Sequence, residues 1–156
     1  MTVQNIAAQD KPVRSQIIPL DACNLLLPNT CIAEVITYVE PEKSEASPDW
    51  LLGTINWRGL NIPLISFEIA NDLPPGPISD KSRIIVLNGI SGNEQLPFYG
   101  IFANGIPRLL NVEKTDLSEE HEAEASLALA LEQIKVADYD AYIPNLDEIE
   151  KMLLSQ

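Results

Sequence analysis

The chain has 156 residues, enough for one compact domain that buries roughly 70% of the surface its unfolded chain would expose. Its 46% hydrophobic and 21% charged residues exclude the composition of a disordered protein. The formal net charge of −13 repels phosphate backbones and anionic lipids, so it argues against nucleic-acid binding and favours partners that are neutral or basic where they meet the chain.

The N-terminal residues 1–16 are polar and lack the apolar core of a signal peptide, and no apolar run reaches the roughly 18 residues of a membrane-spanning helix. We therefore expect a cytoplasmic protein without direct membrane insertion, with a flexible segment at 1–16 and one domain at 17–156. Cys23 and Cys31 have apolar neighbours, and we expect them to be buried free thiols rather than a disulfide.

Twelve prolines exclude long helices over most of the chain, so short strands and turns are expected. Residues 41–49 lack periodicity and predict an exposed loop. Residues 71–80 are rich in proline and predict a linker between two halves of the fold. Four apolar runs have the length of strands: 17–20, 25–27, 35–39 and 84–87.

A hairpin is predicted in the second half of the chain. Residues 98–103 and 106–112 are both strand-like, and they flank Asn104-Gly105, a dipeptide typical of two-residue hairpin turns. Pro107 lacks a main-chain donor, which places the second strand at an edge or a bulge.

The C-terminal third is less uniform. Residues 117–135 fit both helical and strand periodicity, and we interpret the acidic first part as helical or irregular and the second part as a strand. Asn145 is suited to cap a short C-terminal helix, with Glu148 three residues later. The apolar positions of this helix share one face: Leu146, Ile149, Met152 and Leu153.

Little in the sequence favours catalysis, because there is one histidine and none of the common nucleophile, zinc or phosphate-loop motifs. His121 lies among glutamates, so a metal-dependent enzyme that uses His121 and neighbouring carboxylates is an alternative function. A solvated acidic loop explains the same residues more simply. We therefore expect a protein that is not an enzyme and that has no metal site and no cofactor.

The most distinctive segment is 51–67, in which two apolar arms flank a polar turn. Asn56 and Gly59 suit a sharp bend, and Pro63 in the second arm indicates an edge or bulge. Arg58 is thus expected on a rigid turn, where its guanidinium can form forked hydrogen bonds to a partner carboxylate. Composition supports an ion pair with one of the chain's own carboxylates nearly as well.

This segment resembles the LxGxxNxRGxxxPxxxL signature of CheW-like domains, the scaffold modules of bacterial chemosensory arrays. Weaker similarity extends to residues 25–36, 100–110 and the C-terminal helix. At 66–68 and 103–106 the chain departs from the family pattern, which suggests a divergent member similar to the auxiliary adaptors of type IV pilus systems. The signature positions that match in register are Leu51, Gly53, Asn56, Arg58, Gly59 and Pro63, with Phe67 at the final apolar position.

The resemblance implies an all-β fold of two small five-stranded SH3-like β-barrels that share a hydrophobic core, with a short C-terminal helix. It also implies a non-enzymatic adaptor that couples chemoreceptors, the methyl-accepting proteins, to a CheA-type histidine kinase. On the matching positions, Arg58 and Glu34 would face the receptor, while Asn56, Gly59 and Pro63 would shape the loop that presents Arg58. A CheW-like β-barrel module that binds an unrelated partner is the remaining alternative.

Overall fold

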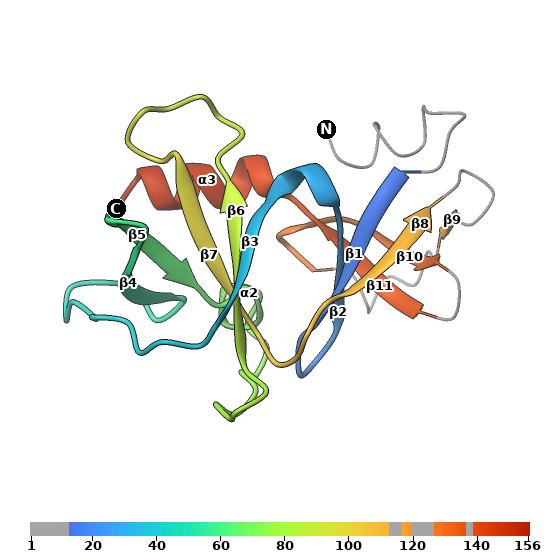
Figure 1. Cartoon of the computed structure of the whole chain (residues 1–156), viewed down its shortest axis with the longest axis horizontal. Coiled ribbons are helices and arrows are strands. Elements are labelled where there is room, and N and C mark those ends of the chain that lie inside the picture. Colours follow the sequence, from blue (N-terminus) through green and yellow to red (C-terminus); the bar gives the residue numbers. More distant parts are fainter. Residues whose placement is uncertain (1–12, 113–116, 120–126, 137–138) are drawn as a thin grey trace.

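The computed structural model of the chain describes residues 13–112, 117–119, 127–136 and 139–156. In these residues the strands form two sheets that lie side by side, with a C-terminal helix packed against them (Figure 1). The first sheet has the order β8-β1-β2-β11-β10-β9, and the second has the order β3-β6-β7-β5-β4.

The strands of the first sheet are β1 (Val13–Pro19), β2 (Asn24–Pro28), β8 (Arg108–Val112), β9 (Leu117–Glu119), β10 (Ala130–Val136) and β11 (Tyr139–Pro144). Those of the second sheet are β3 (Ile32–Thr37), β4 (Leu51–Trp57), β5 (Leu60–Ile65), β6 (Arg83–Asn88) and β7 (Phe98–Ala103). The helices are the short 3-10 turn η1 (Asn29–Cys31), α2 (Phe67–Ala70) and α3 (Leu146–Leu154).

Apolar side chains form three clusters, because the central strands are covered on both faces. In β6, Ile85 and Leu87 point into a core shared by the two sheets, whereas Ile84 and Val86 point into a second cluster inside the second sheet. A third cluster fills the first sheet around Leu26. The inner face of α3 completes the shared core with Leu146, Ile149 and Leu153.

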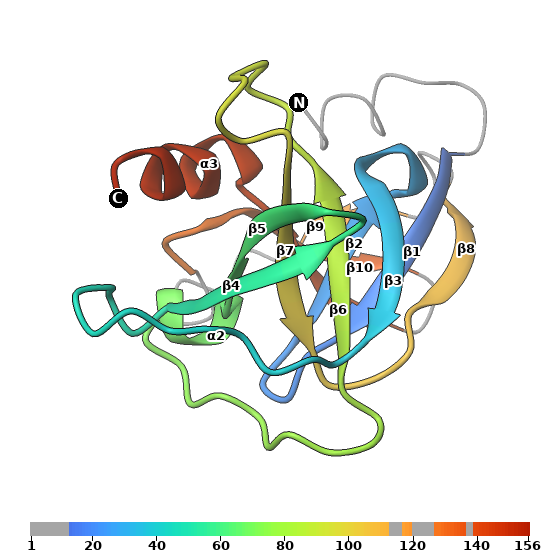
Figure 2. The ribbon, with the colours of Figure 1, turned by 60° about the vertical axis from the view of Figure 1, so that its left-hand side comes forward.

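The predicted hairpin at 98–103 and 106–112 is wrong. Strand β7 pairs with β6 and β5, whereas β8 pairs with β1 in the other sheet, so Asn104-Gly105 carries the chain from one sheet to the other (Figure 2). Gly105 does not have the positive φ that a tight hairpin turn requires, and the main-chain N–H of Asn104 donates to the carbonyl oxygen of Pro19 (2.9 Å). The edge position predicted from Pro107 is confirmed, because β8 is the outermost strand of its sheet.

The proline-rich segment 71–80 does not separate the two halves of the fold. It joins α2 to β6 within the second sheet, and the chain instead changes sheets through η1 and between β7 and β8. Proline indicates irregular backbone but carries no information on which sheet the flanking strands enter.

The termini also differ in part from expectation. Residues 13–16, predicted to be flexible, belong to β1 and pair with both β2 and β8, while 1–12 lie outside the described residues. Main-chain pairing on two sides orders this polar stretch without an apolar pattern. The second part of 117–135 forms β10, as predicted. In the first part, predicted to be helical or irregular, residues 117–119 instead form the strand β9, which pairs with β10, and His121 lies outside the described residues.

The C-terminal helix is confirmed as α3. Its cap is Asn145, whose side chain accepts a hydrogen bond from the main-chain N–H of Glu148 (3.2 Å). Cys31 is buried and Cys23 is half-buried, and both are free thiols. No helix in the described part of the chain is long and apolar enough to cross a membrane.

Candidate functional site

The β4–β5 hairpin has a two-residue turn formed by Arg58 and Gly59. Their φ values are 50° and 79°, and positive φ at both central residues is the requirement of a type I′ hairpin turn. Glycine adopts this conformation freely, while an arginine does so only with the support of its surroundings. The sequence suggested Asn56 and Gly59 as the residues of the bend. In the structure the bend is formed by Arg58 and Gly59, and Asn56 lies in β4 opposite Asn61.

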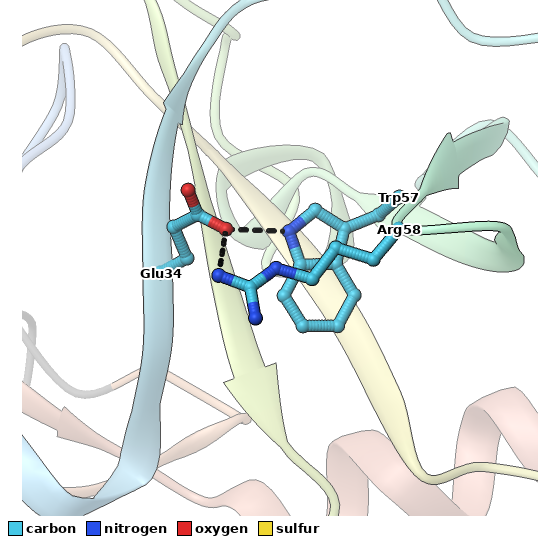
Figure 3. Close-up of polar contacts among 3 residues, drawn as sticks. All are labelled: Glu34, Trp57 and Arg58. Carbon is cyan, nitrogen blue, oxygen red and sulfur yellow. Dashed lines mark hydrogen bonds and ion pairs between the residues drawn. The ribbon is translucent and has the colours of Figure 1, made fainter.

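The side chain of Arg58 folds back onto the protein and contacts two residues (Figure 3). Its Nη2 forms an ion pair with Oε1 of Glu34 on β3 (3.1 Å), and its guanidinium carbon lies 5.0 Å from the centre of the Trp57 ring. The same Oε1 of Glu34 accepts a hydrogen bond from Nε1 of Trp57 (2.9 Å). The internal ion pair that composition supported is therefore present.

Trp57 anchors this cluster. It is only 7% exposed and packs against Phe98, with the ring centres 4.8 Å apart, inside the second sheet. Strands β3 and β4 are the two edges of that sheet, so the contacts of Glu34 join its edges and draw it toward a closed barrel. The sequence gives no signal for this supporting role, because the hydrogen bond joins residues 23 positions apart.

The cluster remains open to solvent despite these contacts. The side chain of Arg58 is 68% exposed and that of Glu34 is 38% exposed. An exposed ion pair of this kind contributes about 0 to 1 kcal/mol, so a partner carboxylate can share or replace Glu34 at small cost. The stacked guanidinium still offers several N–H donors in a fixed plane.

The other predicted residues lie along the arms of the same hairpin. Asn56 is exposed on β4. Pro63 is half-buried on β5 opposite Thr54, and the pairing of β5 with β7 begins only at Leu64. Pro63 thus has a neighbouring strand on one side, which fits its missing N–H donor. The structure brings Arg58 and Glu34 together at the turn that Gly59 completes, whereas Asn56 and Pro63 lie farther along the two strands of the hairpin.

Residues 17–135 match the family model of the CheW-like domain. The chain belongs to the CheW-like domain family. Among solved structures, the crystal structure of the scaffolding protein TtCheW from Thermoanaerobacter tengcongensis is similar, with a TM-score of 0.71 and 19% sequence identity over 85% of this chain and 88% of that chain. No curated protein sequence matches the chain significantly.

The CheW-like fold confirms the architecture expected from the sequence: a mostly β protein with two SH3-like barrels around a shared core and a short C-terminal helix. The three-residue strand β9 adds a sixth strand at the edge of the first sheet. Among the residues that the structure describes, no group of three or more His, Cys, Asp or Glu side chains could hold a metal ion.

Proposed function

We propose that this CheW-like protein is a cytoplasmic, non-enzymatic adaptor in bacterial chemosensory signal transduction, which couples chemoreceptors to a CheA-type histidine kinase. Membership of the family supports a scaffold role. The observation that carries the proposal for this chain is the exposed guanidinium of Arg58, held on the rigid turn of the family signature.

In this proposal Arg58 is a preorganised anchor for a receptor carboxylate. The two-residue turn fixes its backbone, and Trp57 and Glu34 restrict its side chain before any partner arrives. A side chain that is already ordered loses less conformational entropy on binding, so more of the interaction energy contributes to affinity. Glu34 lies beside it on the same face, and Asn56, Gly59 and Pro63 shape the hairpin that presents it.

Replacing Arg58 by the opposite charge tests this role. Arg58→Glu is expected to weaken binding to a receptor signalling domain by at least about tenfold, because an anchoring arginine becomes a repelling carboxylate. The free energy of unfolding should change by no more than about 0.5 kcal/mol, since the side chain is exposed. Titration calorimetry and urea unfolding measure the two effects, and unchanged binding by a folded variant would remove Arg58 from the interface.

Two further variants separate docking from the internal ion pair. The exchange Glu34→Arg with Arg58→Glu restores an internal ion pair with its polarity reversed, so it should remove the repulsion between two glutamates without recovering receptor binding, although the hydrogen bond that Nε1 of Trp57 donates to Glu34 is lost. Arg108→Glu is the matched control, because Arg108 is an exposed arginine on β8 of the other sheet. Recovery of binding by the exchange would mean that only the internal pair matters.

Co-purification from native cells tests the wider proposal, including the suggested link to type IV pilus systems. We expect the chain to recover a chemoreceptor and a CheA-type kinase. Recovery of neither would favour the alternative of a CheW-like module for an unrelated partner. Stoichiometric metal in gently purified protein would instead support the enzyme alternative based on His121.

A further inference from the structure

A second candidate binding site lies near the end of β4 that is remote from the Arg58 turn. A pocket of about 360 Å³ opens there, where the second barrel meets α2 and the 71–80 segment. This volume is at the lower end of the range for ligand pockets, which often occupy the mouths of β-barrels. Its lining includes Tyr38, Glu40, Leu52, Ile69, Ile78 and Phe102.

The inner part of the pocket is apolar and uncharged. Phe102 is 4% exposed, and its ring meets that of Tyr38 edge-on, with the centres 5.7 Å apart and the planes at 88°. The hydroxyl of Tyr38 is neutral at physiological pH, and burial, together with the negative charge of Glu40, raises its pKa further above the ordinary value of 10.0. An apolar group is therefore the complement of this surface.

One wall of the pocket is held in place by side-chain hydrogen bonds. The main-chain N–H of Gly76 donates to Oε1 of Glu68 (3.4 Å), and Nδ2 of Asn104 donates to the carbonyl oxygen of Pro77 (3.2 Å). These bonds hold Ile78 at the rim, where it is 64% exposed. A wall formed before binding lowers the entropy cost of occupying the pocket.

The rim of the pocket is acidic. Glu40 lines it, and the neighbouring Glu42 and Glu45 are exposed on the same segment. Lys43 also lines it, but its ammonium donates to the carbonyl oxygens of Leu51 (3.0 Å) and Pro48 (3.4 Å). Lys43 keeps its positive charge in these bonds, but three glutamates against one lysine leave this segment with a net negative charge, in line with the net charge of −13.

From the apolar interior and the acidic rim together, we propose that this pocket binds an apolar side chain from a partner protein segment that carries lysine or arginine beside it. The apolar side chain fills the space between Phe102, Leu52 and Ile78, and the basic neighbours face Glu40. The site lies apart from the Arg58 cluster, so it does not depend on the proposed receptor contact.

Three end-capped hexapeptides and the isotope-labelled full chain test the proposal by nuclear magnetic resonance titration. The first peptide has a central leucine flanked by lysines, the second has alanine in place of leucine, and the third has glutamates in place of the lysines. We expect the first to shift the resonances of Tyr38, Ile78 and Phe102, and the other two to bind at least about tenfold more weakly. Equal binding of all three peptides, or no shift at these residues, would overturn the proposal.

Matched variants locate the binding. Ile78→Ser should weaken the leucine–lysine peptide about tenfold, whereas Ile106→Ser should not, although both isoleucines are 64% exposed. Glu40→Gln should weaken it about threefold at low salt, and Glu45→Gln should have a smaller effect. Arg58→Glu should leave it unchanged. Equal effects of the pocket and control variants would contradict a site in this pocket.

Discussion

Glu150 is a buried carboxylate that joins α3 to the rest of the fold. It is 1% exposed and accepts hydrogen bonds from the main-chain N–H groups of Ile90 and Ser91 and from the hydroxyl of Tyr99 (3.1 Å). These donors stabilise its charge in place of water. Glu150 therefore couples the last helix to the loop that follows β6.

Removing the charge of Glu150 should be costly. Glu150→Gln directs an amide N–H₂ toward groups that are themselves donors, and we expect the free energy of unfolding to fall by about 2 kcal/mol. Glu148→Gln, at an exposed position in the first turn of α3, should cost less than about 1 kcal/mol. Urea unfolding followed by circular dichroism compares them, and equal losses would argue against the carboxylate's role.

The departure from the family signature at 66–68 has a structural explanation. Ser66 caps α2, because its Oγ accepts a hydrogen bond from the main-chain N–H of Ile69 (3.1 Å). Glu68 is 1% exposed and accepts from the main-chain N–H of Ala22 (2.7 Å) and, at 3.4 Å, from that of Gly76. A carboxylate suits this position because each of its two oxygens accepts from one main-chain donor.

Among the elements, the β4–β5 hairpin depends on glycine, which occupies a turn position and a strand position. Gly59 has a φ of 79°, and no atom lies within 4 Å of the place that a Cβ would take. Gly53 in β4 differs, because there a Cβ would collide with the main chain of Glu42. The requirement at Gly59 is thus purely conformational, whereas that at Gly53 is also steric.

Gly59→Ala should therefore lower the free energy of unfolding by about 1 kcal/mol, which is the cost of a left-handed conformation for an L-residue. Gly59→Asn should lose less, because asparagine tolerates this conformation. Thermal unfolding of both variants, with the wild type alongside, measures the difference. Equal losses for alanine and asparagine would show that the turn does not keep its positive φ in these variants.

Over the whole molecule, buried neutral acids make stability sensitive to alkaline pH. Burial, followed by the charge of Glu68, raises the pKa of Cys23 from 9.0 to about 12. Burial and Glu150 likewise raise the pKa values of Cys31 and Tyr99. The folded protein holds these protons at a pH where the unfolded chain has released them.

Stability is therefore expected to be fully present below about pH 9 and to fall as the pH rises toward about 12, because the unfolded chain then binds fewer protons. Cys23→Ala should reduce the steepness of this fall by the contribution of up to one proton. Urea unfolding over this pH range tests the prediction. An unchanged slope in Cys23→Ala would show that the thiol of Cys23 is not the group that titrates.

Features set by neighbouring residues were predictable from the sequence. The Gly59 turn, the Asn145 cap and the edge position after Pro107 depend on local dihedral angles and missing donors, which follow from residue type. The positive φ of Arg58, which the sequence had suggested for Asn56, was not predictable in this way. The family signature covers the same hairpin, so the sequence also placed the candidate residues there, although the supporting contacts of Trp57 were not foreseen.

Only the tertiary structure decided which segments meet. Asn104-Gly105 has the composition of a hairpin turn, yet β7 pairs with β6 in one sheet and β8 pairs with β1 in the other. These long-range pairings override the local preference for a hairpin. The contact of Glu34 with Trp57 and Arg58 arises in the same way, because it forms only when β3 and β4 come together. The sequence by itself determined the exposed arginine on its turn, and the folded barrel determined the side chains that hold it there.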